Sequence, residues 1–124
     1  TGTILLIDDE KMILDVGCEL LEELGYTVLP ALSGREALQI FQENSTKIDL
    51  VIMDMIMPGM SGGETFDRLR NINQDIKVLL SSGYSLNGQA TQILRRGCDG
   101  FIQKPFNLNQ LAEKIGSIIG SAKG

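Results

Sequence analysis

Short apolar segments alternate with longer amphipathic segments along the whole chain. Apolar residues recur three or four positions apart in the longer segments, which predicts five helices. The short segments are rich in β-branched and aliphatic residues and are typical of strands: Thr3–Ile7, Tyr26–Leu29, Leu50–Met53, Lys77–Leu80 and Gly100–Gln103. Continuously apolar strands separated by helices indicate an α/β fold whose parallel sheet is buried on both faces.

Local signals mark the ends of several helices. Gly25 and Gly97 follow periodic segments and predict helix ends, and Ser33 is a predicted N-cap. The Gly- and Ser-containing segment 120–124 resembles a linker or tail. Because no repeat or second domain is visible, we expect a single domain over residues 1–124.

Composition excludes several classes of function. The 11 basic and 16 acidic residues give a net charge of −5, which argues against direct binding of nucleic acid or an anionic membrane. No apolar run approaches the roughly 18–20 residues of a membrane span. Cys18 and Cys98 are too few for a disulfide framework, which favours free thiols in a reducing cytoplasm. With no histidine, the chain cannot carry a Ser-His-Asp triad, a histidine zinc site or a phosphohistidine of its own.

Polar side chains stand at the carboxyl ends of four predicted strands. Asp8 and Asp9 follow the first strand, Asp54 the third, Ser82 the fourth and Lys104 the fifth. Ligands of open α/β sheets bind beyond the carboxyl ends of the strands. We therefore expect three carboxylates, a hydroxyl and an ammonium group to meet at one edge.

Electrostatics indicates what such a cluster needs. Two carboxylates about 4 Å apart repel by roughly 4 kcal/mol at an effective dielectric constant near 20. Three carboxylates carry more negative charge than Lys104 alone can neutralise, so the cluster favours a bound cation. Because all the donor atoms are oxygens, the predicted ion is Mg²⁺, and Mn²⁺ could take its place. Carboxylates, a hard cation and a lysine describe a phosphoryl-handling site, in which Asp54 is a candidate nucleophile and Ser82 a hydrogen-bond donor.

Four stretches together resemble the receiver domain of bacterial two-component response regulators, and they look most like the receivers of hybrid sensor histidine kinases or stand-alone receivers. They are ILLIDDE (Ile4–Glu10), DLVIMDMIMPGMSG (Asp49–Gly62), KVLLSSGYS (Lys77–Ser85) and GFIQKPF (Gly100–Phe106). The resemblance covers essentially the whole chain. It implies a flavodoxin-like (βα)5 three-layer sandwich with a five-stranded parallel sheet in the order 2-1-3-4-5.

The resemblance also implies a role for each site residue. Asp54 would accept a phosphoryl group from a partner, either a sensor histidine kinase or a histidine phosphotransfer domain. Asp9, Asp54 and the backbone carbonyl of Ile56 would bind Mg²⁺, and Asp8 would act through a bound water. Lys104 would pair with the phosphoryl group.

The family further implies a two-state switch. Ser82, rather than Ser81, matches the switch hydroxyl, and Phe101 matches the switch aromatic residue. The surface around Phe101 would signal to an output domain or protein that the sequence does not identify. The domain would catalyse its own phosphorylation and dephosphorylation rather than act on a separate substrate.

Ile56 and Tyr84 occupy positions that influence hydrolysis of the acyl phosphate in this family. Both are bulky, so we hypothesise that they shield the acyl phosphate from water. Gly59, Gly62 and Gly63 match no phosphate-binding loop and are expected to permit the tight turn under the site.

Two other functions remain open at this point. One is a Mg²⁺-dependent phosphohydrolase with an aspartyl nucleophile, although Ile56 stands where such enzymes usually carry a second acid. The other is an interaction module that works without phosphorylation. This second alternative is disfavoured because the chain keeps all the side chains that phosphorylation would need: Asp8, Asp9, Asp54, Ser82 and Lys104.

Overall fold

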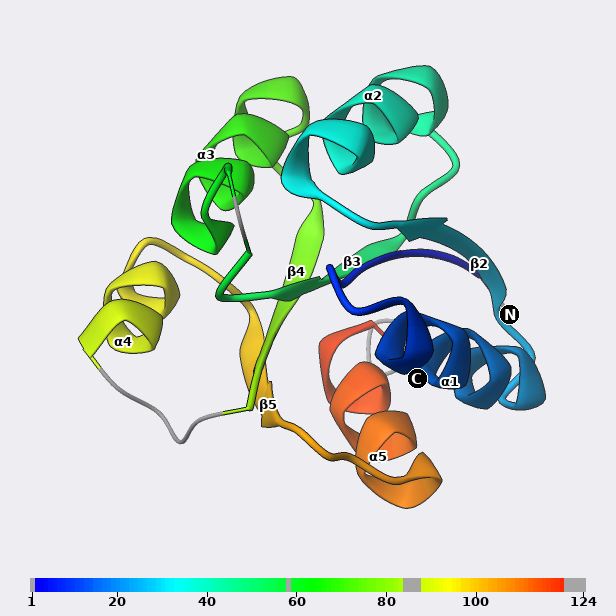
Figure 1. Ribbon diagram of the computed structural model, residues 1–124. Coiled ribbons are helices and arrows are strands. Elements are labelled where there is room, and N and C mark those ends of the chain that lie inside the picture. The colour runs from blue at the N-terminus through cyan, green and yellow to red at the C-terminus, as the bar shows by residue number, and fades with distance from the viewer. Residues whose placement is uncertain (1, 58, 84–87, 120–124) are drawn as a thin grey trace.

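The computed structural model describes residues 2–57, 59–83 and 88–119, so Tyr84 and the predicted tail at 120–124 lie outside the described residues. Strands and helices alternate in strict order (Figure 1). They are β1 (Thr3–Ile7), α1 (Lys11–Glu23), β2 (Thr27–Ala31), α2 (Gly34–Asn44), β3 (Leu50–Asp54), α3 (Gly62–Ile72), β4 (Lys77–Ser82), α4 (Gly88–Arg95), β5 (Gly100–Gln103) and α5 (Leu108–Ile118).

The strands form one parallel sheet in the order β2-β1-β3-β4-β5. Helices α1 and α5 cover one face, and α2, α3 and α4 cover the other (Figure 1). The predicted three-layer α/β sandwich and its strand order are therefore confirmed. None of the helices in the described ranges is both long and apolar enough to cross a bilayer.

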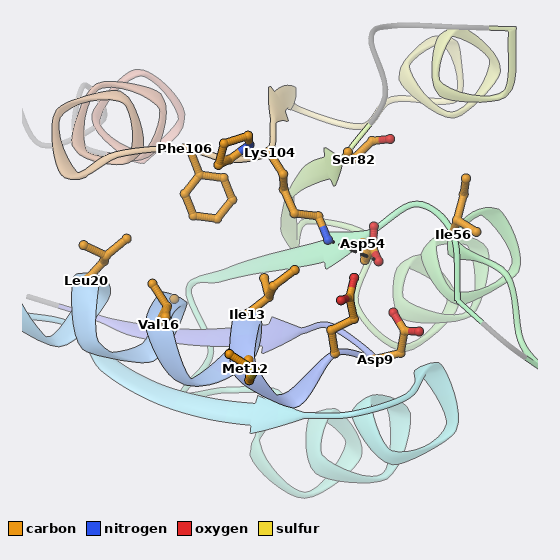
Figure 2. Close-up of a pocket in the computed structure, with 14 residues that line it drawn as sticks. Asp9, Met12, Ile13, Val16, Leu20, Asp54, Ile56, Ser82, Lys104 and Phe106 are labelled. Atoms are coloured by element: carbon orange, nitrogen blue, oxygen red, sulfur yellow. Dashed lines mark ion pairs between the residues drawn. The ribbon is translucent and has the colours of Figure 1, made fainter.

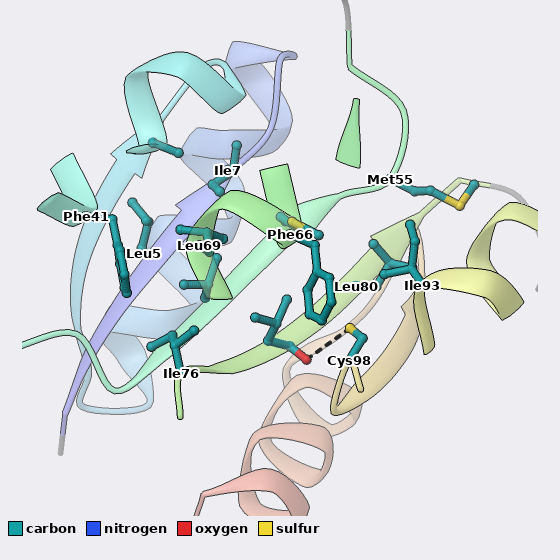
Figure 3. Packing of buried hydrophobic residues seen from close by; sticks show 14 of the residues in the cluster. Leu5, Ile7, Phe41, Met55, Phe66, Leu69, Ile76, Leu80, Ile93 and Cys98 are labelled. Carbon is teal, nitrogen blue, oxygen red and sulfur yellow. Dashed lines mark hydrogen bonds between the residues drawn. The ribbon is translucent and has the colours of Figure 1, made fainter. Parts of the chain in front are cut away.

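Alternate residues of the central strands supply two separate cores, because successive side chains of a strand point to opposite faces. Leu5 and Ile7 of β1 pack in the cluster that contains Phe41 and Phe66 of α2 and α3 (Figure 3). The intervening residue Leu6 packs on the opposite face with α1 and α5. Both faces of the sheet are thus sealed, which leaves its edges for polar chemistry.

Three strands extend beyond the predicted segments, and β3 does so by including Asp54. Strand β2 runs to Ala31 and includes Pro30, which an edge strand tolerates because it needs hydrogen bonds to only one neighbour. Strand β4 includes Ser81 and Ser82, which the sequence placed just after it. The predicted helix end at Gly25 is confirmed by its φ of 98°, a conformation that glycine adopts without a steric penalty.

Candidate functional site

Asp8, Asp9 and Asp54 meet at the carboxyl edge of the sheet. Asp8 and Asp9 directly follow β1, and Asp54 ends β3, which pairs with β1 so that Ile7 lies opposite Met53. One carboxylate oxygen from each of the three lies within 4.8 Å of the others. Asp8 and Asp54 are buried, whereas Asp9 is exposed at the mouth of the site. The predicted acidic cluster is therefore assembled by the pairing of two neighbouring strands.

Lys104 reaches into this cluster from the loop between β5 and α5 (Figure 2). Its Nζ donates to Asp8 Oδ2 at 2.7 Å and lies 3.4 Å from Asp54 Oδ2. Its backbone N–H donates to the carbonyl of Ser82 at 2.7 Å, which fixes the start of the loop against β4. One ammonium group thus faces three carboxylates, and an excess of negative charge remains.

The pKa of Asp54 is raised from 3.8 to about 6. Removal of the carboxylate from water is the main cause, and the charges of Asp8 and Asp9 raise the pKa further, while Lys104 opposes the shift. Burial of Lys104 disfavours its charge, yet its hydrogen bond to Asp8 and the charges of Asp54 and Asp8 outweigh this effect and raise the pKa of Lys104. Burial and the two neighbouring acids thus disfavour the charged form of Asp54 more than Lys104 favours it.

The two serines at the end of β4 have different surroundings. The Ser81 hydroxyl donates to the Met53 carbonyl at 3.2 Å and so helps to hold β4 against β3. Ser82 is also buried, but it lines the cavity that contains Asp54 and Lys104. Ser82 is thus the serine that a group bound at Asp54 could contact.

The other two predicted site residues, Ile56 and Phe101, have different surroundings: Ile56 lines the cavity and Phe101 does not. The side chain of Ile56 is 50% exposed and lines the same cavity as Asp54 (Figure 2). Phe101 is half-buried, pairs with Leu80 of β4 and packs against the core under α4, away from the residues that line the cavity. Asp54 and Phe101 are connected through β4, which pairs with both β3 and β5, and through Lys104, which follows β5 and contacts Asp54.

Sequence reasoning missed an apolar groove that continues from the acidic cluster. The cavity has a volume of about 790 Å³ and extends along one side of α1 to the loop before α5. Its apolar wall is formed by Met12, Ile13, Val16, Leu20 and Phe106 (Figure 2). Met12 is 81% exposed and Val16 is 56% exposed. A signal was present in the sequence, because these two apolar residues are spaced i, i+4 and therefore lie on the same face of the predicted helix.

The donor set of the cluster fits a hard divalent cation. All candidate side-chain ligands are carboxylate oxygens, which Mg²⁺ prefers, and their combined charge exceeds that of Lys104. A cation at this position would favour the charged form of Asp54 and so oppose the burial and the neighbouring negative charges that raise its pKa. A buried carboxylate beside a cation, a lysine and a hydroxyl has the parts needed to take up a phosphoryl group.

Comparison with known proteins agrees with this chemistry. The profile of the family described as "Response regulator receiver domain" matches residues 4–116. Over 115 residues the chain is 38% identical to the sensor kinase CckA of Brucella abortus (strain 2308). The aligned region covers 93% of this chain and 12% of the kinase. The chain therefore spans only a small part of that relative.

Solved structures show the same fold. A response regulator receiver domain protein from Clostridium thermocellum superposes with a TM-score of 0.93 at 35% identity, covering 99% of this chain and 98% of that one. The response regulator TrrA from Thermotoga maritima, solved in complex with Mg²⁺ and BeF, gives a TM-score of 0.83 at 36% identity, covering 94% and 98% of the two chains. Receiver domains bind Mg²⁺ at the acidic pocket, where this chain places Asp8, Asp9 and Asp54.

Fold, acidic pocket and family profile thus agree: the chain belongs to the response regulator receiver domains of bacterial two-component signalling.

Proposed function

We propose that Asp54 is the phosphoacceptor and that its donor is a phosphohistidine on a sensor histidine kinase or histidine phosphotransfer domain. The observation that carries this proposal is the position of Asp54: it is a buried carboxylate between Lys104 and two further acids, at the end of a central strand. Lys104 Nζ lies 3.4 Å from Asp54 Oδ2 and is placed to pair with the incoming anion. The donor must be another domain or protein, because this chain contains no histidine.

The proposed cation ligands are Asp9, Asp54 and the backbone carbonyl of Ile56, with Asp8 acting through a water. The contacts of Asp8 support its indirect role. One of its oxygens accepts the backbone N–H of Glu10 at 2.9 Å, and the other accepts Lys104. Mg²⁺ is the proposed resident ion, and Mn²⁺ should substitute for it because it prefers the same oxygen ligands.

In the transfer step an Asp54 carboxylate oxygen attacks phosphorus and a P–O bond forms. The P–N bond to the histidine breaks, and the imidazole nitrogen leaves with the bonding electrons. A bound divalent cation supplies positive charge next to the phosphoryl oxygens. Lys104 shares that role, and the Ser82 hydroxyl donates to a phosphoryl oxygen.

The proposed output is a shift between two conformations through Ser82 and Phe101. Ser82 lies opposite Gln103 of β5, and Phe101 lies opposite Leu80 of β4. A movement at Ser82 would therefore act on β4 and on the neighbouring strand β5, which carries Phe101. The receiving output domain or protein is not specified by this chain.

We further propose that the apolar groove along α1 receives a helix of the phosphodonor. The groove opens onto Asp54, so a helix seated in it would carry its phosphohistidine to the acceptor. Asp15 is paired with Lys11, whereas the exposed residue Glu19 lies near Val16 on α1, which favours a partner helix with a basic residue beside its apolar side.

The deciding experiment is incubation with acetyl phosphate and Mg²⁺, read by intact mass. We expect one added phosphoryl group on the wild-type chain and on Asp75→Asn, a control at an exposed acid, and none on Asp54→Asn. Equal modification of Asp54→Asn and wild type would refute the proposed acceptor. Steady turnover of small phosphate esters would instead favour the phosphohydrolase.

We also propose that residues 1–124 form one cytoplasmic receiver domain whose last residues, 120–124, are a linker or tail. The family profile over residues 4–116 supports the domain assignment. Limited proteolysis of the whole chain should remove the last residues and leave a resistant fragment that contains α5.

A further inference from the structure

We propose that Gly62 is a positioning residue for the phosphoacceptor site. As the first residue of α3, it lies directly against the backbone of Met55 and the carbonyl oxygen of Asp54. Its missing side chain lets α3 begin at that position, which sets the place of the Asp54 carboxylate and of the Ile56 carbonyl. The inference rests on the proposed function and assigns a role to a residue that contributes no ligand.

The contact is too close for any other residue. A Cβ atom on Gly62 would lie 2.6 Å from the Met55 carbonyl oxygen, 2.9 Å from Met55 Cα and 3.0 Å from the Asp54 carbonyl oxygen. All three are backbone atoms, so none can rotate away as the end of a flexible side chain would. The backbone of Gly62 is helical, and alanine at such a position would otherwise favour the helix by up to about 1 kcal/mol.

The Met55 peptide is held from both sides. Its N–H donates to the Ser81 carbonyl at 2.8 Å, and its carbonyl accepts the Gly62 N–H at 3.1 Å. The next carbonyl along the chain is that of Ile56, the proposed backbone ligand. A displacement of Met55 is thus transmitted to Asp54 on one side and to Ile56 on the other.

An added methyl group on Gly62 would push this peptide rather than the helix. Helix α3 is anchored by Thr65, Phe66 and Leu69, whose side chains are buried against the sheet and its neighbours. Because α3 cannot retreat without opening the core, the segment that follows Asp54 has to move. Displaced supporting groups typically cost metal sites 10–100-fold in affinity.

The neighbouring Gly63 provides a matched control on the same helical turn. A Cβ atom there would meet the guanidinium end of Arg96 at 2.9 Å and Ile93 side-chain atoms at 3.8 Å. The Arg96 side chain is partly exposed and can rotate away. Gly63→Ala therefore makes the same chemical change in the same helix without touching the backbone of Asp54.

The test is a titration of the full chain with Mn²⁺ alone. Binding is measured as the decrease in the electron paramagnetic resonance signal of free Mn²⁺. We expect Gly62→Ala to lose at least about tenfold in Mn²⁺ affinity, and Gly63→Ala to stay within about twofold of wild type. Urea unfolding without metal, in parallel, reports the fraction of each variant that is folded. Should Gly62→Ala be partly unfolded, the titration is repeated in trimethylamine N-oxide, which favours the folded state.

Three results would overturn the inference. The first is an unchanged Mn²⁺ affinity of folded Gly62→Ala, whatever its urea midpoint, because Gly62 would then matter only for stability. The second is an equal loss in Gly63→Ala. The third is a Gly62→Ala chain that stays unfolded even with the osmolyte, which would make the glycine a requirement of the fold rather than of the site. If wild type itself bound no Mn²⁺, the proposed cation site would fail first, and the inference with it.

Discussion

Lys104 lies closer to Asp8, at 2.7 Å, than to the proposed acceptor Asp54, at 3.4 Å. Its shorter contact is therefore made to a carboxylate that is not the proposed acceptor. This arrangement holds the ammonium group beside Asp54 without binding it tightly, so a phosphoryl group on Asp54 can take over part of the contact. When no metal is bound, the ammonium group of Lys104 is therefore the cation that pairs with both carboxylates.

Replacement of Lys104 by methionine should destabilise the chain most at high pH. Loss of one partner from a buried ion pair typically costs about 3–5 kcal/mol, because the remaining charge stays buried and unpaired. We expect about 3 kcal/mol at pH 8 without divalent cations, and less at pH 5, where Asp54 is largely protonated. The matched control is Lys11→Met, which removes an exposed pair with Asp15 and should change stability by less than about 1 kcal/mol. Similar urea midpoints for the two variants at pH 8 would contradict this account of Lys104.

Stability should depend on pH through Asp54. The folded-state pKa, about 6, lies above the ordinary value of 3.8, so the folded chain holds the proton more tightly than the unfolded chain does. The stabilisation is complete below about pH 4 and is lost as pH rises through 6, by about 3 kcal/mol in total. In urea titrations without metal, Asp54→Asn should match wild type near pH 4 and exceed it at pH 8. A difference that did not vary with pH, or one that Asp75→Asn reproduced, would argue against this assignment.

Ile56→Asn should shorten the lifetime of the acyl phosphate. The Ile56 side chain lines the cavity around Asp54 and is half-exposed, so an amide there would admit and orient water. The measurement is loss of the phosphoryl mass after removal of acetyl phosphate. Ile72→Asn, at an exposed apolar residue of α3, is the control and should leave the lifetime unchanged. Tyr84→Ala tests the other half of the shielding hypothesis, at a residue outside the described ranges. Unchanged acyl-phosphate lifetimes in both Ile56→Asn and Tyr84→Ala would contradict the shielding hypothesis.

The apolar groove should matter for protein donors but not for small ones. Met12→Ser combined with Val16→Ser removes exposed apolar surface on α1 without touching Asp54. We expect phosphorylation by a phosphorylated histidine phosphotransfer domain that is active on wild type to slow about tenfold, which corresponds to about 1.4 kcal/mol of lost contact energy. Phosphorylation by acetyl phosphate should be unchanged, and Ile72→Ser should behave as wild type with both donors. Equal slowing with both donors would place the defect in the site itself.

Much of the fold and site could be predicted because the signals are local. The period of two within strands and of 3.6 within helices is visible in any window of the chain, and it is sufficient to predict the alternating elements. The rule that ligands gather at the carboxyl ends of parallel strands then brings Asp8, Asp54 and Lys104 to one edge. These predictions need only the order of the elements. They do not need the angles at which the helices pack.

The remaining features depend on contacts between segments far apart in the chain. The sequence by itself determined the α/β alternation and the acids and lysine at the strand ends, since both follow from local pattern and strand order. Only the tertiary structure decided that Lys104 favours Asp8 over Asp54, that Phe106 closes a groove against α1, and that Gly62 lies against the Asp54 peptide. The physical reason is that such contacts depend on how the helices seat on the sheet within a few tenths of an ångström, and no local pattern encodes that distance.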